Sequence, residues 1–376
     1  MPRGIGLREL RSINIATTTP NPSEADTSHQ DPVSTTKSTQ ELAEKMLNKY
    51  VPEDGKDDTD IVLRSFLGNL PDDGRWNICS DILECAAKGK LRELRGNLVT
   101  ALLLPIKARG RTLVVEISPR NGAEANINEI GTYLEPSSRK DQADLKRSCL
   151  RRDNHRCLAT GMYDTNAPSE IVSEEMEEVQ TAFTECAHII PFSFGDFTES
   201  QSLTTATTWD TLYRCFPSIR SQVNLGSSTI NDPSNALTLL RDLHKSFGSF
   251  TFALEPKQDE QDVYLMRRYR KFPTMYLPLF PKDGVVKLTN HDPSVPPPSP
   301  TLLGAHAAIA KVLHATGLGE AIDKIMEERK DIGCLASDGT TDVEALLLIQ
   351  LERYNSIPFQ PRQIQSQGHD PPNLER

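Results

Sequence analysis

The stretch "NDPSNALTLLRDLHKSFGSFTFALEP", residues 231–256, predicts a turn, a strand, a short helix and a second strand in close succession. Its first five residues favour a turn, and "ALTLL" is the kind of short apolar run that forms a buried strand. Asp242 is a plausible N-cap for the helix, which would place His244 in the first helical turn. Gly248 would end that helix, and "FTFAL" returns as a strand.

A second apolar run, "ECAHIIPF" at residues 185–192, contains His188. A lone histidine on an apolar strand is most often a packed core residue. The order His188, Asn235, His244, however, places two imidazoles on separate elements with a turn amide between them. Such parts can form a hydrolytic metal site: one imidazole accepts a proton from water, the other holds a divalent cation, and the amide fixes the turn. The order alone is a weak signal, because it arises by chance in many chains.

Three motifs occur in a specific order before the opening stretch, and the second of them contains the apolar run with His188. They are "RRDNHRCLATG" at residues 151–161, "TECAHIIPFSF" at 184–194 and "WDTLYRCF" at 209–216. Together with the opening stretch, this set resembles the HNH endonuclease family over residues 147–256. More narrowly, it is similar to fungal proteins that embed an HNH nuclease domain between helical flanks, and "LLGAHAAIAKVLHATGLGEAID" at 302–323 resembles such a flank.

The resemblance implies a ββα-metal fold and a metal-dependent nuclease. By position, His188 would be the general base that activates water, and Asn235 would hold the loop and orient His188. His244 would be a metal ligand. The ion would be Mg²⁺ first, with Mn²⁺ or Zn²⁺ as alternatives, and the partner would be nucleic acid, DNA ahead of RNA.

The sequence departs from the family pattern directly before the first histidine. Many HNH sites have an aspartate ligand there, whereas this chain has Ala187. On a strand, Glu185 shares the face of Ala187 and is therefore a candidate replacement ligand, with Asp242 as another candidate. The missing aspartate leaves open a catalytically degenerate HNH fold that serves as a binding or scaffold module. A helical protein–protein adaptor, based on the two flanks, is a third interpretation.

Basic residues cluster on both sides of the His–Asn–His core, although the whole chain has a formal net charge of −10. That charge argues against a uniformly basic nucleic-acid binder. Arg151 and Arg152 belong to the first cluster, and Arg267 and Arg268 to the second. A phosphate backbone could lie on such a surface, with binding that weakens as salt rises. The alternative is two solvated faces that balance acidic neighbours.

The expected elements predict a mixture of helices and strands, and with the resemblance they imply an α+β fold with a central HNH module flanked by helical regions. "RTLVVEIS" at residues 111–118 predicts one strand within the N-terminal region. The expected organisation is a disordered tail at 1–37, a helical region with one strand at 38–135, the HNH-like domain at 136–290, a stiff Pro-rich linker at 291–300, a helical region at 301–355 and a flexible tail at 356–376.

The chain shows no secretory signal and no apolar run long enough to span a bilayer. Its seven cysteines are odd in number and lack framework spacing, which indicates a reducing compartment. We therefore expect an intracellular protein without membrane contact, and the sequence leaves nucleus or cytoplasm, oligomeric state and target sequence open. Cys157 has no partner at CxxC spacing and is expected to be a buried structural thiol.

Overall fold

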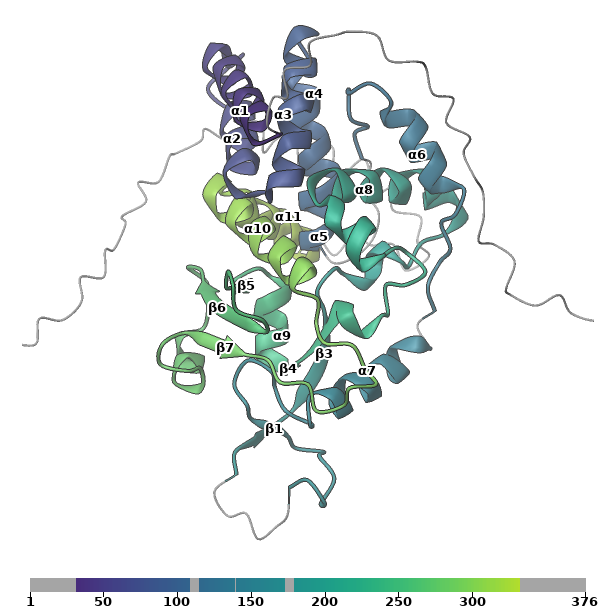
Figure 1. The fold of residues 1–376 in the computed structure, drawn as a ribbon, viewed down its shortest axis with the longest axis vertical. Helices are drawn as coiled ribbons and strands as arrows, with labels where there is room; N and C mark the ends of the chain where they lie inside the picture. Colours follow the sequence, from purple (N-terminus) through teal and green to yellow (C-terminus); the bar gives the residue numbers. More distant parts are fainter. Residues whose placement is uncertain (1–31, 109–114, 139, 173–178, 332–376) are drawn as a thin grey trace, which may run out of the picture.

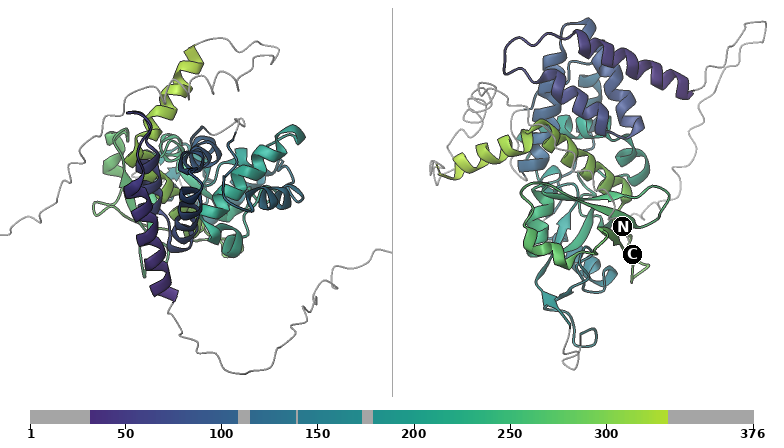
Figure 2. Two further views of the ribbon diagram at one scale, coloured as in Figure 1. Left: turned by 90° about the horizontal axis from the view of Figure 1, so that it is seen from above. Right: turned by 90° about the vertical axis from the view of Figure 1, so that its left-hand side faces the viewer.

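The computed structural model describes residues 32–108, 115–138, 140–172 and 179–331, and these form a mixed α+β fold. Figures 1 and 2 show the N-terminal helices at one end of the molecule and the strands towards the other, with helix α10 between them. The α+β class expected from the sequence is confirmed. None of the helices in the described part of the chain is long and apolar enough to cross a membrane.

The N-terminal region is a helical layer. Its helices are amphipathic, and buried side chains such as Leu63 and Phe66 face the shared core. The first helix begins at Pro32, ahead of the expected start of order at residue 38, and proline suits a first helical turn. The elements are α1 (Pro32–Lys49), α2 (Thr59–Asn69), α3 (Asp72–Ala87), α4 (Leu91–Leu98), the π-helical turn η1 (Val99–Leu103), α5 (Leu104–Ala108) and α6 (Ala123–Gly131).

The strand expected at residues 111–118 is wrong for the part that the structure describes. Residues 115–118 are irregular, and residues 111–114 lie outside the described residues. The backbone amide of Glu116 donates to Thr100 Oγ1 at 2.9 Å, and the Glu116 carbonyl accepts from Asn97 Nδ2 at 2.7 Å. Side chains of the neighbouring helices therefore satisfy backbone groups that would otherwise need a partner strand.

The central module is built around an antiparallel two-stranded sheet. Strand β3 (Thr184–His188) pairs with β4 (Ala236–Leu240), with His188 opposite Ala236 and Glu185 opposite Leu239. Helix α9 (Arg241–Gly248) follows β4 directly, so the expected strand-then-helix order is present. Helix α7 (Asp141–Arg152) packs against both strands of this sheet.

Two smaller sheets complete the module. Strands β1 (Tyr163–Asp164) and β2 (Thr181–Ala182) form a short parallel pair. Strands β5 (Phe252–Pro256), β6 (Val263–Arg268) and β7 (Val285–Lys287) form an antiparallel sheet in that order. Between β3 and β4 the chain forms η2 (Phe192–Phe194), η3 (Glu199–Gln201), α8 (Ser202–Cys215), η4 (Ile219–Val223) and η5 (Pro233–Asn235), and η6 (Thr274–Leu279) lies between β6 and β7.

Helices α10 (Pro300–Thr316) and α11 (Leu318–Asp331) follow the Pro-rich segment. This segment, expected to be a stiff linker, is fastened to the module. The Arg152 guanidinium donates to the Pro296 carbonyl at 3.1 Å, and the Ser299 amide donates to the Ser234 carbonyl at 2.8 Å. The helix expected at residues 341–355 lies outside the described residues.

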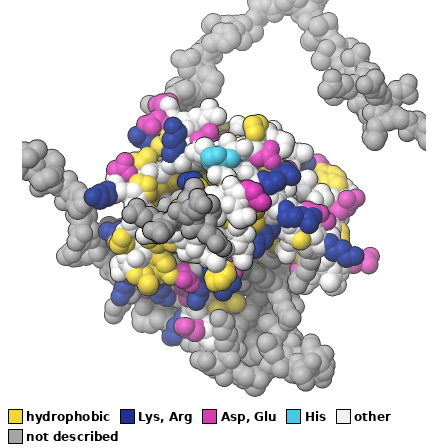
Figure 3. Space-filling model, turned by 90° about the horizontal axis from the view of Figure 1, so that it is seen from below, with side chains coloured by type: hydrophobic (Ala, Val, Ile, Leu, Met, Phe, Trp, Pro, Cys, Tyr) yellow, Lys and Arg dark blue, Asp and Glu magenta, His cyan; other side chains and the backbone are white. Residues whose placement is uncertain are grey.

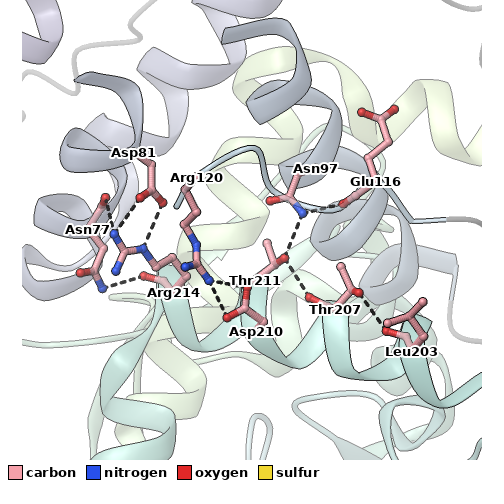
Figure 4. A network of polar contacts seen from close by, with 10 residues as sticks. All are labelled: Asn77, Asp81, Asn97, Glu116, Arg120, Leu203, Thr207, Asp210, Thr211 and Arg214. Carbon is pink, nitrogen blue, oxygen red and sulfur yellow. Dashed lines mark hydrogen bonds and ion pairs between the residues drawn. The ribbon is translucent and has the colours of Figure 1, made fainter. Parts of the chain in front are cut away.

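A single hydrophobic core includes residues from the N-terminal helices, the central module and α10. A buried polar network fastens α8 to the N-terminal layer, as Figure 4 shows. Arg214 forms an ion pair with Asp81 of α3 at 2.7 Å, and Arg120 pairs with Asp210 at 2.6 Å. The domain boundaries expected from the sequence stay a prediction, because the described regions share this core.

Candidate active site

Asn235 holds the loop that follows His188. Its side chain is fully buried, and its Oδ1 accepts from the backbone amide of Ile190 at 2.8 Å. Its Nδ2 donates to the carbonyl of Ile190 at 3.0 Å and to the carbonyl of Ile230 at 2.9 Å. One amide thus fixes the backbone two residues beyond His188 to the turn before β4, which is the loop-holding position that the sequence assigned to Asn235.

The ring of His188 itself is bound by a different amide. Its Nε2 lies 3.0 Å from Oδ1 of Asn231, the first residue of the turn. Nδ2 of Asn231 donates to Ser137 Oγ at 2.9 Å and to the Ser138 carbonyl at 3.2 Å. Because the amide nitrogen is directed at these acceptors, Oδ1 faces the ring and Nε2–H must be the donor. This arrangement leaves Nδ1 with a lone pair and without a hydrogen-bond partner among the described residues.

The surroundings of His188 favour the neutral ring. Burial lowers the pKa of His188; the hydrogen bond with Asn231 acts in the opposite direction, and the nearby His244 lowers the pKa further. The Phe192 ring lies beside the imidazole, with the ring centroids 5.9 Å apart. A neutral imidazole whose tautomer is set by a neighbouring amide is the form that can accept a proton from water.

Glu185 and His244 form the second part of the site. His244 Nδ1 lies 2.7 Å from Glu185 Oε2, and Arg241 Nε donates to the other carboxylate oxygen at 3.1 Å. Burial raises the pKa of the Glu185 carboxyl, but the contacts with His244 and Arg241 outweigh it, so the pKa lies below its ordinary value. Ala187, the position of the absent aspartate, is fully buried in the core.

The prediction that Asp242 is the N-cap of helix α9 is wrong. The N-cap position of α9 is Leu240, and Asp242 sits in the first turn without a capping hydrogen bond. Its carboxylate accepts a hydrogen bond from the hydroxyl of Tyr276 instead. Short polar side chains cap a helix only from the residue that precedes it, and α9 begins two residues earlier than expected.

The donor set of Glu185 and His244 fits a divalent ion as a partial site. Nδ1–H of His244 donates to Glu185 Oε2 at 2.7 Å, because a carboxylate only accepts, so His244 would hold an ion through Nε2. The described residues contain no group of three or more His, Cys, Asp or Glu side chains that could hold a metal. Mg²⁺ commonly uses one or two protein ligands and takes the rest from water and substrate phosphate, so two ligands suffice.

Glu185, His188 and His244 line one cavity of about 810 Å³. Gln142 and Lys146 of α7 form one part of its wall, and the segment from Ile189 to Gln201 forms another. Pro105 and His306 contribute from α5 and α10, so both helical flanks take part in the wall of the site. The structure therefore places His188, His244 and Glu185 together, with Asn235 directly behind them.

The four arginines expected to bind nucleic acid occupy different environments. Arg152 is fully buried and binds Asp153 together with the carbonyls of the turn and of the Pro-rich segment, so a role at a phosphate surface is wrong for this residue. Arg151 is exposed and pairs with Asp292 at 3.1 Å. Arg267 pairs with Glu255, and Arg268 is exposed.

Figure 3 shows the end of the molecule opposite the N-terminal helices. Lysine and arginine side chains are interspersed there with aspartate and glutamate, and they do not gather into one basic patch. On this face, a phosphate backbone would meet alternating charges.

Sequence reasoning missed two residues of the site. Asn231 is visible only as a turn former, because its contact with His188 depends on how the turn folds back. Arg241 directly follows the predicted strand and was assigned no role, although it neutralises part of the Glu185 charge. In the sequence, only the presence of Asn231 and Asn235 in one turn indicates that one amide could bind the His188 ring while the other holds the loop after it.

Residues 157–255 match a family model described as HNH endonuclease. The matched segment contains β3, β4 and α9, and with them Glu185, His188, Asn235 and His244. The chain thus carries an HNH endonuclease domain at its centre, which confirms the family expected from the motifs. No curated protein and no solved structure matches the chain.

Proposed function

We propose that this HNH domain is an active, metal-dependent nuclease that hydrolyses phosphodiester bonds, DNA ahead of RNA. The observation that carries the proposal is the shared cavity. It joins a neutral, tautomer-fixed His188 to a carboxylate–imidazole pair that fits a divalent ion. The matched family supports nucleic acid as the partner.

In the proposed reaction, Nδ1 of His188 accepts a proton from water while the water oxygen attacks phosphorus. The bond from phosphorus to the leaving oxygen breaks, and that oxygen takes a proton from solvent water and ends as a hydroxyl. Asn231 keeps Nε2 protonated so that Nδ1 is the basic atom, and Asn235 holds the loop that carries the ring. When bound by Glu185 and His244, Mg²⁺ or Mn²⁺ would supply charge stabilisation at the phosphate and the leaving oxygen.

Plasmid nicking tests this proposal. The purified chain should nick supercoiled plasmid with Mg²⁺ or Mn²⁺, and His188→Ala should abolish the nicking. His291→Ala is a matched control, because His291 is exposed and lies outside the cavity. Equal nicking by parent and His188→Ala would refute the role of His188.

A catalytically degenerate scaffold is the second candidate, favoured by Ala187 at the position where many HNH sites have an aspartate ligand. Titration calorimetry with Mn²⁺ separates the two. A folded chain that binds no divalent ion and nicks no plasmid would support the scaffold. The six described cysteines are free thiols, which supports the intracellular location that we propose for either function.

A further inference from the structure

The cavity that contains His188 and His244 is also lined by Phe197, an aromatic side chain that the proposed chemistry does not use. Phe194 is buried and packs edge-to-face on Trp209 with the ring centroids 5.8 Å apart. Phe192 packs against the core and beside His188. Phe197 differs from both, because it lines the cavity, is only half-buried and takes no part in the hydrophobic core.

The segment that carries Phe197 is anchored on both sides. The Gly195 carbonyl accepts from the Ser137 amide at 2.7 Å, and a Cβ at Gly195 would lie 2.6 Å from the Ser227 carbonyl oxygen. On the other side, Thr198 and Gln201 form a reciprocal capping box at the start of η3. Phe197 therefore sits on a short, fixed segment, and a fixed aromatic ring loses little entropy when a ligand stacks on it.

We propose that Phe197 is a stacking platform for an unpaired nucleobase next to the scissile phosphate, so that the preferred substrate is single-stranded or locally unpaired nucleic acid. This inference rests on the proposed function. A base in a duplex has both faces stacked on neighbours, so only an unpaired base can offer a face to Phe197. The cavity volume of about 810 Å³ lies within the range of pockets for small ligands and can receive a nucleotide.

Polar groups in the same cavity complement such a ligand. Lys146 and Gln142 are one helical turn apart on α7, with Lys146 exposed at the cavity. An ammonium suits a backbone phosphate, and an amide can bond a base edge in either direction.

The charge of the chain supports local stacking over a long backbone contact. The net charge is −10 and the face shown in Figure 3 mixes both signs, so neutralisation of many phosphates is not available there. Stacking on an aromatic ring contributes to single-strand binding regardless of sequence. Stacking on Phe197 would therefore select unpaired nucleic acid over duplex at the site of His188.

Equilibrium binding to the full chain tests the proposal. The background is His188→Ala in the presence of EDTA, so that no turnover occurs. The probes are a fluorescent single-stranded oligonucleotide and a hairpin duplex that contains the same sequence. We expect tighter binding of the single strand, and Phe197→Ala should weaken it about fivefold to 150-fold. Phe197→Leu should lose most of the affinity because it keeps the bulk without the ring, and Phe197→Tyr should keep it.

Trp76→Ala is the matched control, because Trp76 is an exposed aromatic residue on α3 outside the cavity. Equal affinity for single strand and duplex, or a Phe197→Leu variant that binds like its parent, would overturn the inference. Nicking by the chain with His188 intact is a separate readout. A chain that binds through Phe197 but never nicks would refute only the nuclease, whereas a chain that nicks duplex independently of Phe197 would refute only the platform.

Discussion

Replacement of Asn231 by aspartate tests whether His188 acts as a neutral base. The Asn231 oxygen lies 3.0 Å from Nε2 of His188, so Asn231→Asp places a carboxylate beside the ring with almost no change in size. In the parent chain, burial lowers the pKa of His188, and the nearby His244 lowers it further against the opposing effect of Asn231. A base with a lowered pKa stays unprotonated at neutral pH and loses activity only as the pH falls through that lowered pKa.

The expected change in the rate profile follows from charge proximity. An opposite charge at this distance raises the pKa of a cationic acid such as imidazolium by about one to three. A carboxylate at position 231 would stabilise the imidazolium, raise the pKa of His188 and move the acid limb of the rate profile to higher pH by the same amount. At a fixed pH on that limb, the rate falls about tenfold for every increase of one in the pKa of His188, and it recovers at higher pH.

Initial rates of plasmid nicking across a pH series measure this effect at saturating Mn²⁺. Ser137→Ala is the matched control, because it removes a partner of the Asn231 amide without adding charge near His188. We expect its acid limb to coincide with that of the parent. An Asn231→Asp variant that melts like the parent and keeps the parental acid limb would refute the role of a neutral His188.

Three further predictions concern the supporting residues. Asn235→Ala leaves three buried backbone groups without partners, so the free energy of unfolding in urea should fall by about 3 kcal/mol or more; a loss below about 1 kcal/mol would contradict the assigned contacts. Arg152→Met leaves the buried Asp153 carboxylate without its partner, so the free energy of unfolding should fall by about 3–5 kcal/mol. Arg151→Met should change the free energy of unfolding by about 0.5 kcal/mol or less. Equal losses in the two variants would contradict the different burial of the two arginines. Glu185→Gln should weaken Mn²⁺ binding in calorimetry about tenfold or more, and unchanged affinity would remove Glu185 from the site.

The sequence predicted β4 and the helix of the site because their patterns are local, whereas the pairing of β4 with β3 followed from the family resemblance. A turn cluster, an apolar run and a helix that ends near Gly248 determine the order of β4 and α9 over a few residues. The motifs then placed His188 and His244 on these elements, and the structure brings both to one cavity. The family assignment succeeded for the same reason, since its motifs are short contiguous stretches and most of their residues lie within the matched range 157–255.

Non-local contacts account for what the sequence did not predict. Arg151 and Arg152 are neighbours of equal charge, yet helix geometry directs one to solvent and the other into the module, where it binds four groups. The Pro-rich composition predicted a stiff linker, but it could not predict that the carbonyl of Pro296 is a partner of that buried guanidinium. Composition describes the chain itself, whereas these roles depend on residues distant in sequence.

The C-terminal flank packs against the helix that carries His244 of the candidate site, and this weakens the interpretation of the flanks as a separate adaptor. Helix α9 has only eight residues, too few to be stable alone, so its position depends on tertiary packing. His306 of α10 supplies that packing, because its ring stacks on Phe247 with the centroids 3.8 Å apart and on Phe250 at 4.4 Å. Since α9 carries His244, the placement of the proposed metal ligand depends on α10. The apolar side chains of α10 are buried inside the molecule, so a partner protein could reach them only by disrupting the site.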